Sequence, residues 1–290
     1  MAAGRFAWVL NLDADLELAA RHAYTPKQSV RAAMQPWTEL LARSLLGPDD
    51  VLVDESSAPG SAHGLVGRAF CPTPRAIAML VRAGAEPEPH PSVEVLRLVN
   101  SRAFAASLGP NLPGAELVTS LERATEMLAS LPPVGRGWRV KRNFGMTGRG
   151  QRVVEAATDA DLAFVRAGLD EGGVQIEPNV EIVAEYALHG LLGADGSREF
   201  GVPVRQHCDA RGAWISTEPL LPSKDNRELF EQLVDEVACV AHHLARAGYF
   251  GPFGVDAFTY RGEGGALALQ PRSEINARYS MGFAVGFRRP

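Results

Sequence analysis

A pentapeptide near the C-terminus, "EINAR" at residues 274–278, carries three side chains that can bind charged groups. In an extended strand alternate side chains share a face, so Glu274, Asn276 and Arg278 would point the same way. Upstream, "FGVDAFTY" places Asp256 on an apolar strand, where a lone carboxylate needs a partner. Two carboxylates and an amide oxygen are hard ligands of the kind that Mg²⁺ prefers. The pattern predicts a metal site, and a solvated edge strand with a Glu–Arg pair is the alternative.

A second stretch, "WRVKRNFGMTGRGQRVV" at residues 138–154, combines glycines with cationic side chains. It lacks the GxxxxGK[ST] order of a Walker A loop and does not lead from a strand into a helix. Two strand-like runs flank it instead, which predicts a hairpin with a glycine-rich tip at Gly145, Gly148 and Gly150. Backbone N–H groups at such a tip can fold over phosphates, and Lys141 is a mobile cation suited to phosphate oxygens. The alternative is an exposed basic hairpin.

Three segments of the chain would position these groups. Residues 1–98 alternate short apolar runs with helical spacing, as in "AWVLNL" and "PRAIAMLVRAGA", which predicts a small α/β unit with parallel strands. Residues 99–174 hold helical stretches around the glycine-rich hairpin. Residues 175–290 combine several strands with an amphipathic helix at 228–251. The predicted fold class is therefore α/β (α+β), and the loop at 56–64 is either a linker or a mobile substrate loop.

Composition argues against several classes of protein. The formal net charge of -5 argues against broad nucleic-acid binding, which needs a basic face. No run of about eighteen apolar residues occurs, so no membrane span is expected. The cysteines are far apart and form no CxxC pair, which argues against a disulfide framework or a cysteine-based zinc site. This cysteine usage fits a reducing cytoplasm.

Taken in order along the chain, these motifs resemble those of the ATP-grasp superfamily. The resemblance covers the chain from about Val99 to the C-terminus, and it rests on Lys141 together with "GMTGRG", "QIEPNVEIVAEY", "GVDAF" and "EINAR". It implies an ATP-grasp fold preceded by an N-terminal α/β pre-ATP-grasp domain, residues 1–98. Residues 99–174 would be the small subdomain that carries the lid hairpin, and residues 175–290 the C-terminal subdomain with the hinge and the metal site.

The resemblance assigns roles in ATP binding to several positions. Lys141, and Arg102 where a lysine is common, match the cations at the phosphates, and Gly145, Gly148 and Gly150 match the lid. Backbone groups around Gln175, Ile176 and Glu177 match the hinge that reads the adenine edge. Glu185 matches the acidic residue at the ribose hydroxyls, although its spacing is one residue off the pattern, so Glu181 stays a competitor. Arg149 is left open between contact with the γ-phosphate and exposure to water.

The resemblance also implies catalytic and metal-binding roles. Asp256, Glu274 and Asn276 match the Mg²⁺ ligands, and Arg278 matches the arginine at the transferred phosphate or the acyl intermediate. In "VPVRQHC", Arg205 and His207 alternate onto one strand face, where they flank the transferred phosphate or the acceptor, or else lie on a polar surface strand.

The function that follows from the resemblance is that of an ATP-grasp ligase. It would use ATP and Mg²⁺ to activate a small-molecule carboxylate as an acyl phosphate, which an amine or thiol acceptor then attacks. The alternatives are an ATP-dependent phosphotransferase acting on a small molecule and a non-catalytic ATP-binding protein. The expected setting is cytoplasmic, without nucleic-acid or membrane partners. Family members are often dimers, so the resemblance allows a homodimer, while the sequence itself leaves the oligomeric state open.

Overall fold

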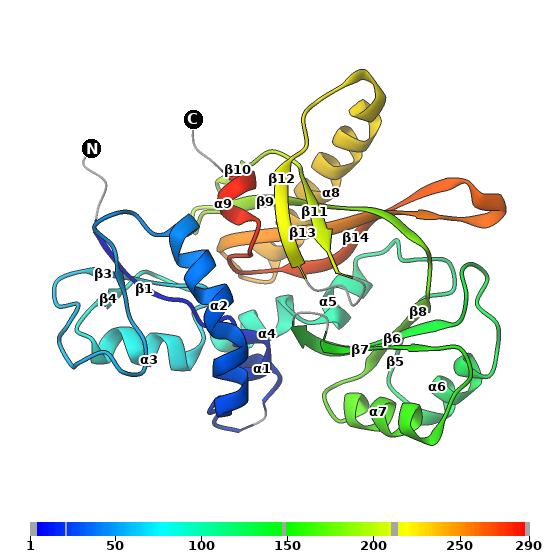
Figure 1. The fold of residues 1–290 in the computed structure, drawn as a ribbon, viewed down its shortest axis with the longest axis horizontal. Coiled ribbons are helices and arrows are strands. Elements are labelled where there is room, and N and C mark those ends of the chain that lie inside the picture. The colour runs from blue at the N-terminus through cyan, green and yellow to red at the C-terminus, as the bar shows by residue number, and fades with distance from the viewer. Residues whose placement is uncertain (1–4, 21, 147–148, 210–213, 288–290) are drawn as a thin grey trace.

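The computed structural model describes residues 5–20, 22–146, 149–209 and 214–287. It contains three β-sheets with helices packed against them (Figure 1). The N-terminal part, blue to cyan, lies at one end of the molecule, and the green middle part lies at the other. The yellow-to-red C-terminal part lies above the other two in this view, and its β13–β14 hairpin extends over the green part. Within the residues described, no helix is both long and apolar enough to cross a membrane.

The N-terminal sheet is parallel and has the strand order β2-β1-β3-β4. Its strands are β1 (Phe6–Val9), β2 (Val51–Leu52), β3 (Val66–Ala69) and β4 (Glu86–Pro87), and its helices are α1 (Ala14–Ala19), α2 (Gln28–Leu45), α3 (Pro74–Arg82) and α4 (Val93–Val99). The chain leaves β1 for β2 on one side and later reaches β3 on the other. Ligands of open parallel sheets bind at the carboxyl ends of the strands where the order reverses in this way. The loops after β1 and β3 are therefore a candidate binding edge.

The loop at residues 56–64 packs against the end of α3. The N–H groups of Gly60 and Ala62 donate to the carbonyl oxygens of Arg82 and Ala83, at 3.2 and 2.7 Å. Ala62 is fully buried in the core of this sheet. This packing is that of a structural connection, the first of the two alternatives for this loop.

The middle sheet is antiparallel, with the order β5-β8-β6-β7. Its strands are β5 (Glu116–Val118), β6 (Trp138–Met146), β7 (Arg149–Val154) and β8 (Val174–Pro178), and its helices are α5 (Arg102–Ser107), α6 (Leu121–Leu128) and α7 (Asp159–Leu169). Ser101 begins α5, because its hydroxyl accepts the Phe104 N–H and separates this helix from α4. Helices α6 and α7 share an apolar core with the sheet. Strands β6 and β7 form the predicted hairpin, and Gly148 at its tip lies outside the described residues.

The C-terminal sheet has the order β12-β11-β9-β13-β14, and β10 also pairs with β9. Its strands are β9 (Ile182–Leu192), β10 (Arg198–Phe200), β11 (Val204–Cys208), β12 (Trp214–Pro219), β13 (Gly251–Arg261) and β14 (Leu267–Asn276); its helices are α8 (Arg227–Arg246) and α9 (Phe283–Gly286), with single 3₁₀ turns at Lys224–Asn226 and Glu263–Gly265. The apolar stripe of α8 packs into a core that also contains Trp8 and Leu10 from the N-terminal part. The N- and C-terminal parts therefore share one hydrophobic core.

Strand β8 pairs with β5 and β6 and so extends the middle sheet. The chain crosses to the C-terminal sheet between Pro178 and Ile182. Most of β8 therefore lies in the segment expected to form the C-terminal subdomain, although the strand belongs to the middle sheet, and the division at 98/99 and 174/175 stays a prediction.

Candidate active site

A cavity of about 510 Å³ lies where the three parts of the chain meet. Its lining comes from the loop after β1, from α2, from the hairpin strands β6 and β7, and from strands β9, β11, β12, β13 and β14 of the C-terminal sheet. Nine of the residues singled out in the sequence line it: Arg102, Lys141, Gly145, Glu177, Glu185, Asp256, Glu274, Asn276 and Arg278. These residues are far apart in the sequence, and the fold brings them to one space.

Other predicted residues lie elsewhere. Gln175 and Ile176 are buried in the middle sheet and, with Gly150, are absent from the described cavity lining. Gly150 has a φ of +83°, which glycine adopts more readily than other residues. Arg205 is exposed on β11, because strand alternation turns Gln206 and Cys208 to the cavity instead.

An acidic face forms where β13 and β14 run side by side. Asp256 lies directly opposite Glu274 in the strand register. Gln206 Nε2 donates to Asp256 Oδ1 at 2.9 Å, and Asn276 Nδ2 donates to Asp256 Oδ2 at 2.8 Å. Arg102 Nη2 lies 3.4 Å from Glu274 Oε1. Burial, together with the charge of Glu274, raises the pKa of Asp256 to about 7.

The donor set of this face fits a hard divalent cation. Two carboxylates face each other, and a cation between them would remove their repulsion. The amide nitrogen of Asn276 is engaged by Asp256, so its carbonyl oxygen is oriented as a further oxygen ligand. Oxygen ligands of this kind suit Mg²⁺. Among the described residues no group of three or more His, Cys, Asp or Glu side chains could hold a metal ion, so the predicted set depends on the amide of Asn276.

A cationic face lies on β6. Lys141 Nζ is 2.5 Å from Glu177 Oε1, and both side chains are buried. Burial lowers the pKa of Lys141, and the charge of Glu177 offsets this effect only in part. Arg139 donates to Asn179 Oδ1 at 2.8 Å and to Gln151 Oε1 at 3.2 Å. The cavity therefore has a cationic side on the hairpin sheet and an acidic side on the C-terminal sheet.

The end of β14 connects this site with the N-terminal part. Arg278 Nη2 donates to Asp15 Oδ2 at 2.8 Å, and its guanidinium carbon lies 5.2 Å from the centre of the Phe70 ring. Ser280 follows in the lining, and its hydroxyl is 2.8 Å from His189 Nε2. Burial lowers the pKa of His189 to about 4, so the ring that holds Ser280 is neutral at pH 7.

A register shift between β13 and β14 determines which side chains of β14 face the cavity. The pairing of β13 with β14 shifts register between Asp256 and Phe258. Without a shift, Arg272 would share the face of Glu274, since the two residues are two positions apart. Arg272 instead pairs with Glu236 of α8 and donates to the Ala105 carbonyl at 3.1 Å. The bulge thus separates a structural arginine from the acidic face.

Several lining residues carried no sequence motif. Gln206 and Arg205 lie on opposite faces of β11. Strand alternation could therefore have indicated Gln206 as the residue that reaches the cavity if the face of Arg205 does not. Trp37, Phe70 and Trp214 reach the cavity from separate parts of the chain. Ser280 lies two residues beyond "EINAR", and its proximity to that motif was the one available signal.

No family model and no curated protein matches this sequence. Solved structures do match it in fold. The N5-carboxyaminoimidazole synthetase of Staphylococcus aureus, complexed with ADP, is 13% identical with a TM-score of 0.53, over 97% of this chain and 72% of that one. The N5-carboxyaminoimidazole ribonucleotide synthetase of Thermus thermophilus is 20% identical with a TM-score of 0.51, over 94% and 71%.

A second kind of enzyme matches over a similar extent. The biotin carboxylase of Campylobacter jejuni, in a β,γ-ATP complex, is 13% identical with a TM-score of 0.54, over 98% of this chain and 72% of that one. Both kinds of enzyme are ATP-grasp proteins. The chain therefore has the mixed helix-and-sheet ATP-grasp fold that its ordered motifs predicted.

Proposed function

We propose that this protein is an ATP- and Mg²⁺-dependent ligase that activates a carboxylate as an acyl phosphate for attack by an amine or thiol. The observation that carries the proposal is the meeting of two opposite faces in one cavity. Lys141 lies on the cationic side, Asp256, Glu274 and Asn276 lie on the oxygen-rich side, and Arg102 of α5 lies beside Glu274. A Mg²⁺–triphosphate group needs both kinds of face at once.

The nucleotide fits along the hinge between the middle and C-terminal sheets. Pro178, Val180 and Ile182 line the cavity there and offer apolar contact to a base. Glu185 lines the cavity, and in this proposal its carboxylate accepts hydrogen bonds from the ribose hydroxyls. Glu181 is exposed and does not line the cavity. Lys141 would exchange Glu177 for phosphate oxygens. An ion pair between an ammonium group and a phosphate oxygen 4 Å apart contributes on the order of 4 kcal/mol before desolvation, at an effective dielectric constant near 20.

Asp256, Glu274 and Asn276 would hold the metal. Bound Mg²⁺ neutralises charge that develops on the phosphates during transfer. The side chains of the protein orient the reactants and stabilise charge, and they need supply no covalent nucleophile.

The reaction proceeds in two substitutions. A carboxylate oxygen forms a bond to the γ-phosphorus while the bond to the ADP oxygen breaks. The amine nitrogen then forms a bond to the acyl carbon, loses a proton, and phosphate leaves. Arg278 lies beside the metal face, where its guanidinium can bind the transferred phosphoryl group.

Product analysis tests the proposal directly. The protein is incubated with ATP, Mg²⁺ and a library of carboxylates and amines, and ADP, phosphate and the condensed product are measured. We expect ADP and phosphate to form only when both substrates are present. A stable phosphorylated product without condensation would indicate a phosphotransferase. Binding of ATP without turnover on any substrate would indicate a non-catalytic protein.

The site assignment is tested with matched variants. Asp256→Asn and Glu274→Gln should each lower turnover at least a hundredfold, because each removes a charged metal ligand. Glu231→Gln, on the exposed face of α8, is the control and should leave turnover unchanged. Full substrate-dependent turnover in both site variants would show that the metal site lies elsewhere.

A further inference from the structure

The cavity has an apolar end that the nucleotide and metal residues leave unused. Leu12 follows β1 and Phe70 follows β3, so both lie at the carboxyl edge of the N-terminal sheet. Helix α2 and the C-terminal part supply the other side chains. The set is called the apolar wall here and consists of Leu12, Met34, Trp37, Phe70, Trp214 and Met281.

Aromatic rings give the apolar wall a defined shape. Trp37 and Trp214 pack edge to face, with 5.8 Å between the ring centroids. The indole N–H of Trp214 donates to Thr217 Oγ1 at 2.7 Å, so its polar atom is satisfied within the protein. Both indoles are only partly buried. A ligand that covered them with apolar groups would remove this surface from water, which is favourable.

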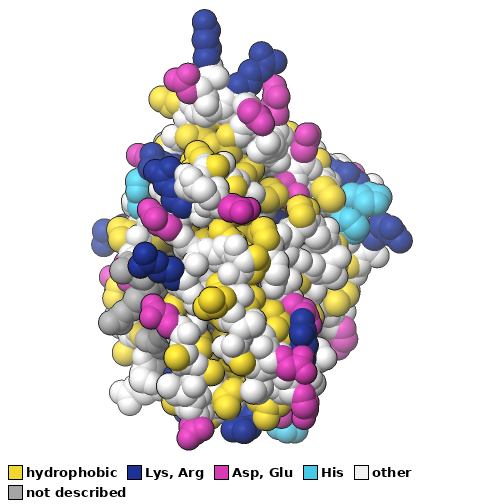
Figure 2. All heavy atoms as spheres, turned by 90° about the vertical axis from the view of Figure 1, so that its right-hand side faces the viewer, with side chains coloured by type: hydrophobic (Ala, Val, Ile, Leu, Met, Phe, Trp, Pro, Cys, Tyr) yellow, Lys and Arg dark blue, Asp and Glu magenta, His cyan; other side chains and the backbone are white. Residues whose placement is uncertain are grey.

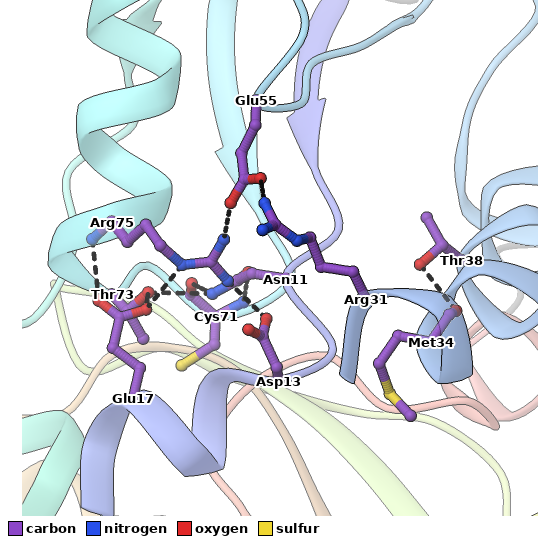
Figure 3. A network of polar contacts seen from close by, with 10 residues as sticks. All are labelled: Asn11, Asp13, Glu17, Arg31, Met34, Thr38, Glu55, Cys71, Thr73 and Arg75. Atoms are coloured by element: carbon purple, nitrogen blue, oxygen red, sulfur yellow. Dashed lines mark hydrogen bonds and ion pairs between the residues drawn. The ribbon is translucent and has the colours of Figure 1, made fainter. Parts of the chain in front are cut away.

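The charged groups of α1, α2, α3 and the loops beside them are paired with one another in a network next to Met34 (Figure 3). Arg75 lies between carboxylates, with Asp13 Oδ1 at 2.5 Å and Glu55 Oε1 at 3.1 Å. Glu17 Oε2 lies 3.7 Å from its Nε atom. Arg31, which comes from α2, also pairs with Glu55. The guanidinium groups in this network are therefore already neutralised.

Among the described residues that pair with one another here, the balance of charge is negative. Arg278 pairs with Asp15 at 2.8 Å, which completes a described set of four carboxylates and three guanidinium groups: Asp13, Asp15, Glu17 and Glu55 with Arg31, Arg75 and Arg278. Asp13 Oδ2 is buried and has no hydrogen-bond partner among the described residues. A phosphate ester at this end would meet this negative field, and Arg31 and Arg75, the two guanidinium groups of this set that the proposed reaction does not use, already have carboxylate partners.

We infer that the organic substrate beside Arg278 carries an apolar group about the size of a phenyl ring and no phosphate ester. The inference rests on the proposed function, because it names the class of substrate for the same site. The apolar group packs on the apolar wall, and the polar head of the substrate reaches Arg278 and Ser280. The Thermus thermophilus enzyme of the same fold, by contrast, is named for a ribonucleotide.

Binding measurements test the inference without relying on turnover. Calorimetry with Mg²⁺ and a non-hydrolysable ATP analogue compares L-phenylalanine with O-phospho-L-serine, which share one backbone and differ in the side-chain group. We expect at least tenfold tighter binding of L-phenylalanine. 4-Phenylbutyrate and phenethylamine then distinguish whether the carboxylate or the amine substrate carries the apolar group, and tight binding of either supports the inference.

Variants of α2 make the test specific to the apolar wall. Trp37→Ala should weaken L-phenylalanine binding at least tenfold and leave the affinity for the ATP analogue unchanged. Met34→Lys should weaken it as well and strengthen binding of O-phospho-L-serine. Leu40→Ala, exposed on the same helix, is the control and should change neither affinity.

The outcomes separate this inference from the proposed function. Binding of phenyl compounds that Trp37→Ala abolishes, without turnover on any substrate, would support the apolar wall and refute the ligase. Condensation with phosphate esters that equals or exceeds condensation with phenyl compounds would keep the ligase and overturn the inference. Binding of phenyl compounds that Trp37→Ala leaves intact, or no binding of them at all, would also overturn it.

Discussion

Two glutamates four residues apart, Glu181 and Glu185, have different surroundings. Glu185 is half-buried in the cavity lining, and the thiol of Cys208 hydrogen-bonds to it. We expect Glu185→Gln to weaken binding of the ATP analogue about tenfold or more, because a hydrogen bond to a charged group contributes about 1.5–3 kcal/mol. Glu181→Gln is the matched control and should bind normally in calorimetry. Equal losses in the two variants would contradict the assignment of the ribose site.

His189 makes the stability of the fold depend on pH. Burial lowers its pKa to about 4 from an ordinary value of 6.5, so protons bind the unfolded chain first as the pH falls. The contribution of His189 to the free energy of unfolding is therefore fully present above pH 6.5. It is lost as the pH falls from 6.5 to 4, and the loss is on the order of 3 kcal/mol. Urea unfolding of the wild type and of His189→Gln should show this loss in the wild type alone.

A surface histidine provides the control for that measurement. His242 is exposed on α8, and His242→Gln should retain the acid-side loss of the wild type. Parallel pH profiles for the wild type and His189→Gln would show that the buried imidazole is not the cause.

At the scale of single residues, the sequence indicated side chains whose type implies charge chemistry. Lys141, Asp256, Glu274, Asn276 and Arg278 all line the cavity, as their grouping in motifs suggested. The sequence did not indicate Gln206 or Ser280, because a neutral polar residue on a strand or in a loop has no signature of its own. Their roles depend on Asp256 and His189, which only the fold brings within hydrogen-bonding distance.

At the scale of elements, Arg272 of β14 connects its strand with helices α5 and α8. Its side chain is 2% exposed, pairs with Glu236 of α8 and donates to carbonyl groups after and within α5. We expect Arg272→Met to lower the free energy of unfolding by about 3–5 kcal/mol, because it leaves a largely buried carboxylate unpaired. Chemical denaturation measures this change.

The control for Arg272 is an ion pair in a different environment. Arg227 and Glu231 form an exposed pair one helical turn apart on α8. Arg227→Met should cost no more than about 0.5 kcal/mol, since solvent screens such pairs. Similar losses in the two variants would show that burial of Arg272 contributes little.

Alternation along strands predicted part of this arrangement. It correctly placed Glu274 and Asn276 on one face of β14. It also placed Arg205 and His207 together, but it could not say which face of β11 meets the cavity. The bulge in β14 was not predictable either, because a register shift arises from pairing with β13 and leaves no local pattern in the sequence.

At the scale of the whole molecule, one core joins the two ends of the chain. Leu244 of α8 and Trp8 of β1 belong to the same buried cluster, while Val165 belongs to the separate core of the middle sheet. We expect Leu244→Ala to lower stability by about 2–5 kcal/mol and to increase hydrogen exchange in β1 as well as in β13. Val165→Ala should increase exchange chiefly in the middle sheet. An effect of Leu244→Ala confined to β13 would refute the shared core.

On the side that Figure 2 shows, the described residues of the outer surface form no large patch of a single charge or of hydrophobic side chains. Positive and negative side chains are interspersed there among hydrophobic ones, over the end of the molecule formed by the middle sheet and the β13–β14 hairpin. The apolar wall was not predictable, since its members come from α2, three loops and β12.

Three cations that line the cavity each have a carboxylate partner of their own: Lys141 with Glu177, Arg102 with Glu274 and Arg278 with Asp15. An anionic ligand that binds these three cations must therefore compete with their internal anions. Binding exchanges one set of ion pairs for another and leaves their number nearly constant. The affinity for nucleotide should consequently depend less on ionic strength than the charge of a triphosphate suggests. If the site binds ATP as proposed, these internal anions should also favour the release of a product that carries less charge than ATP.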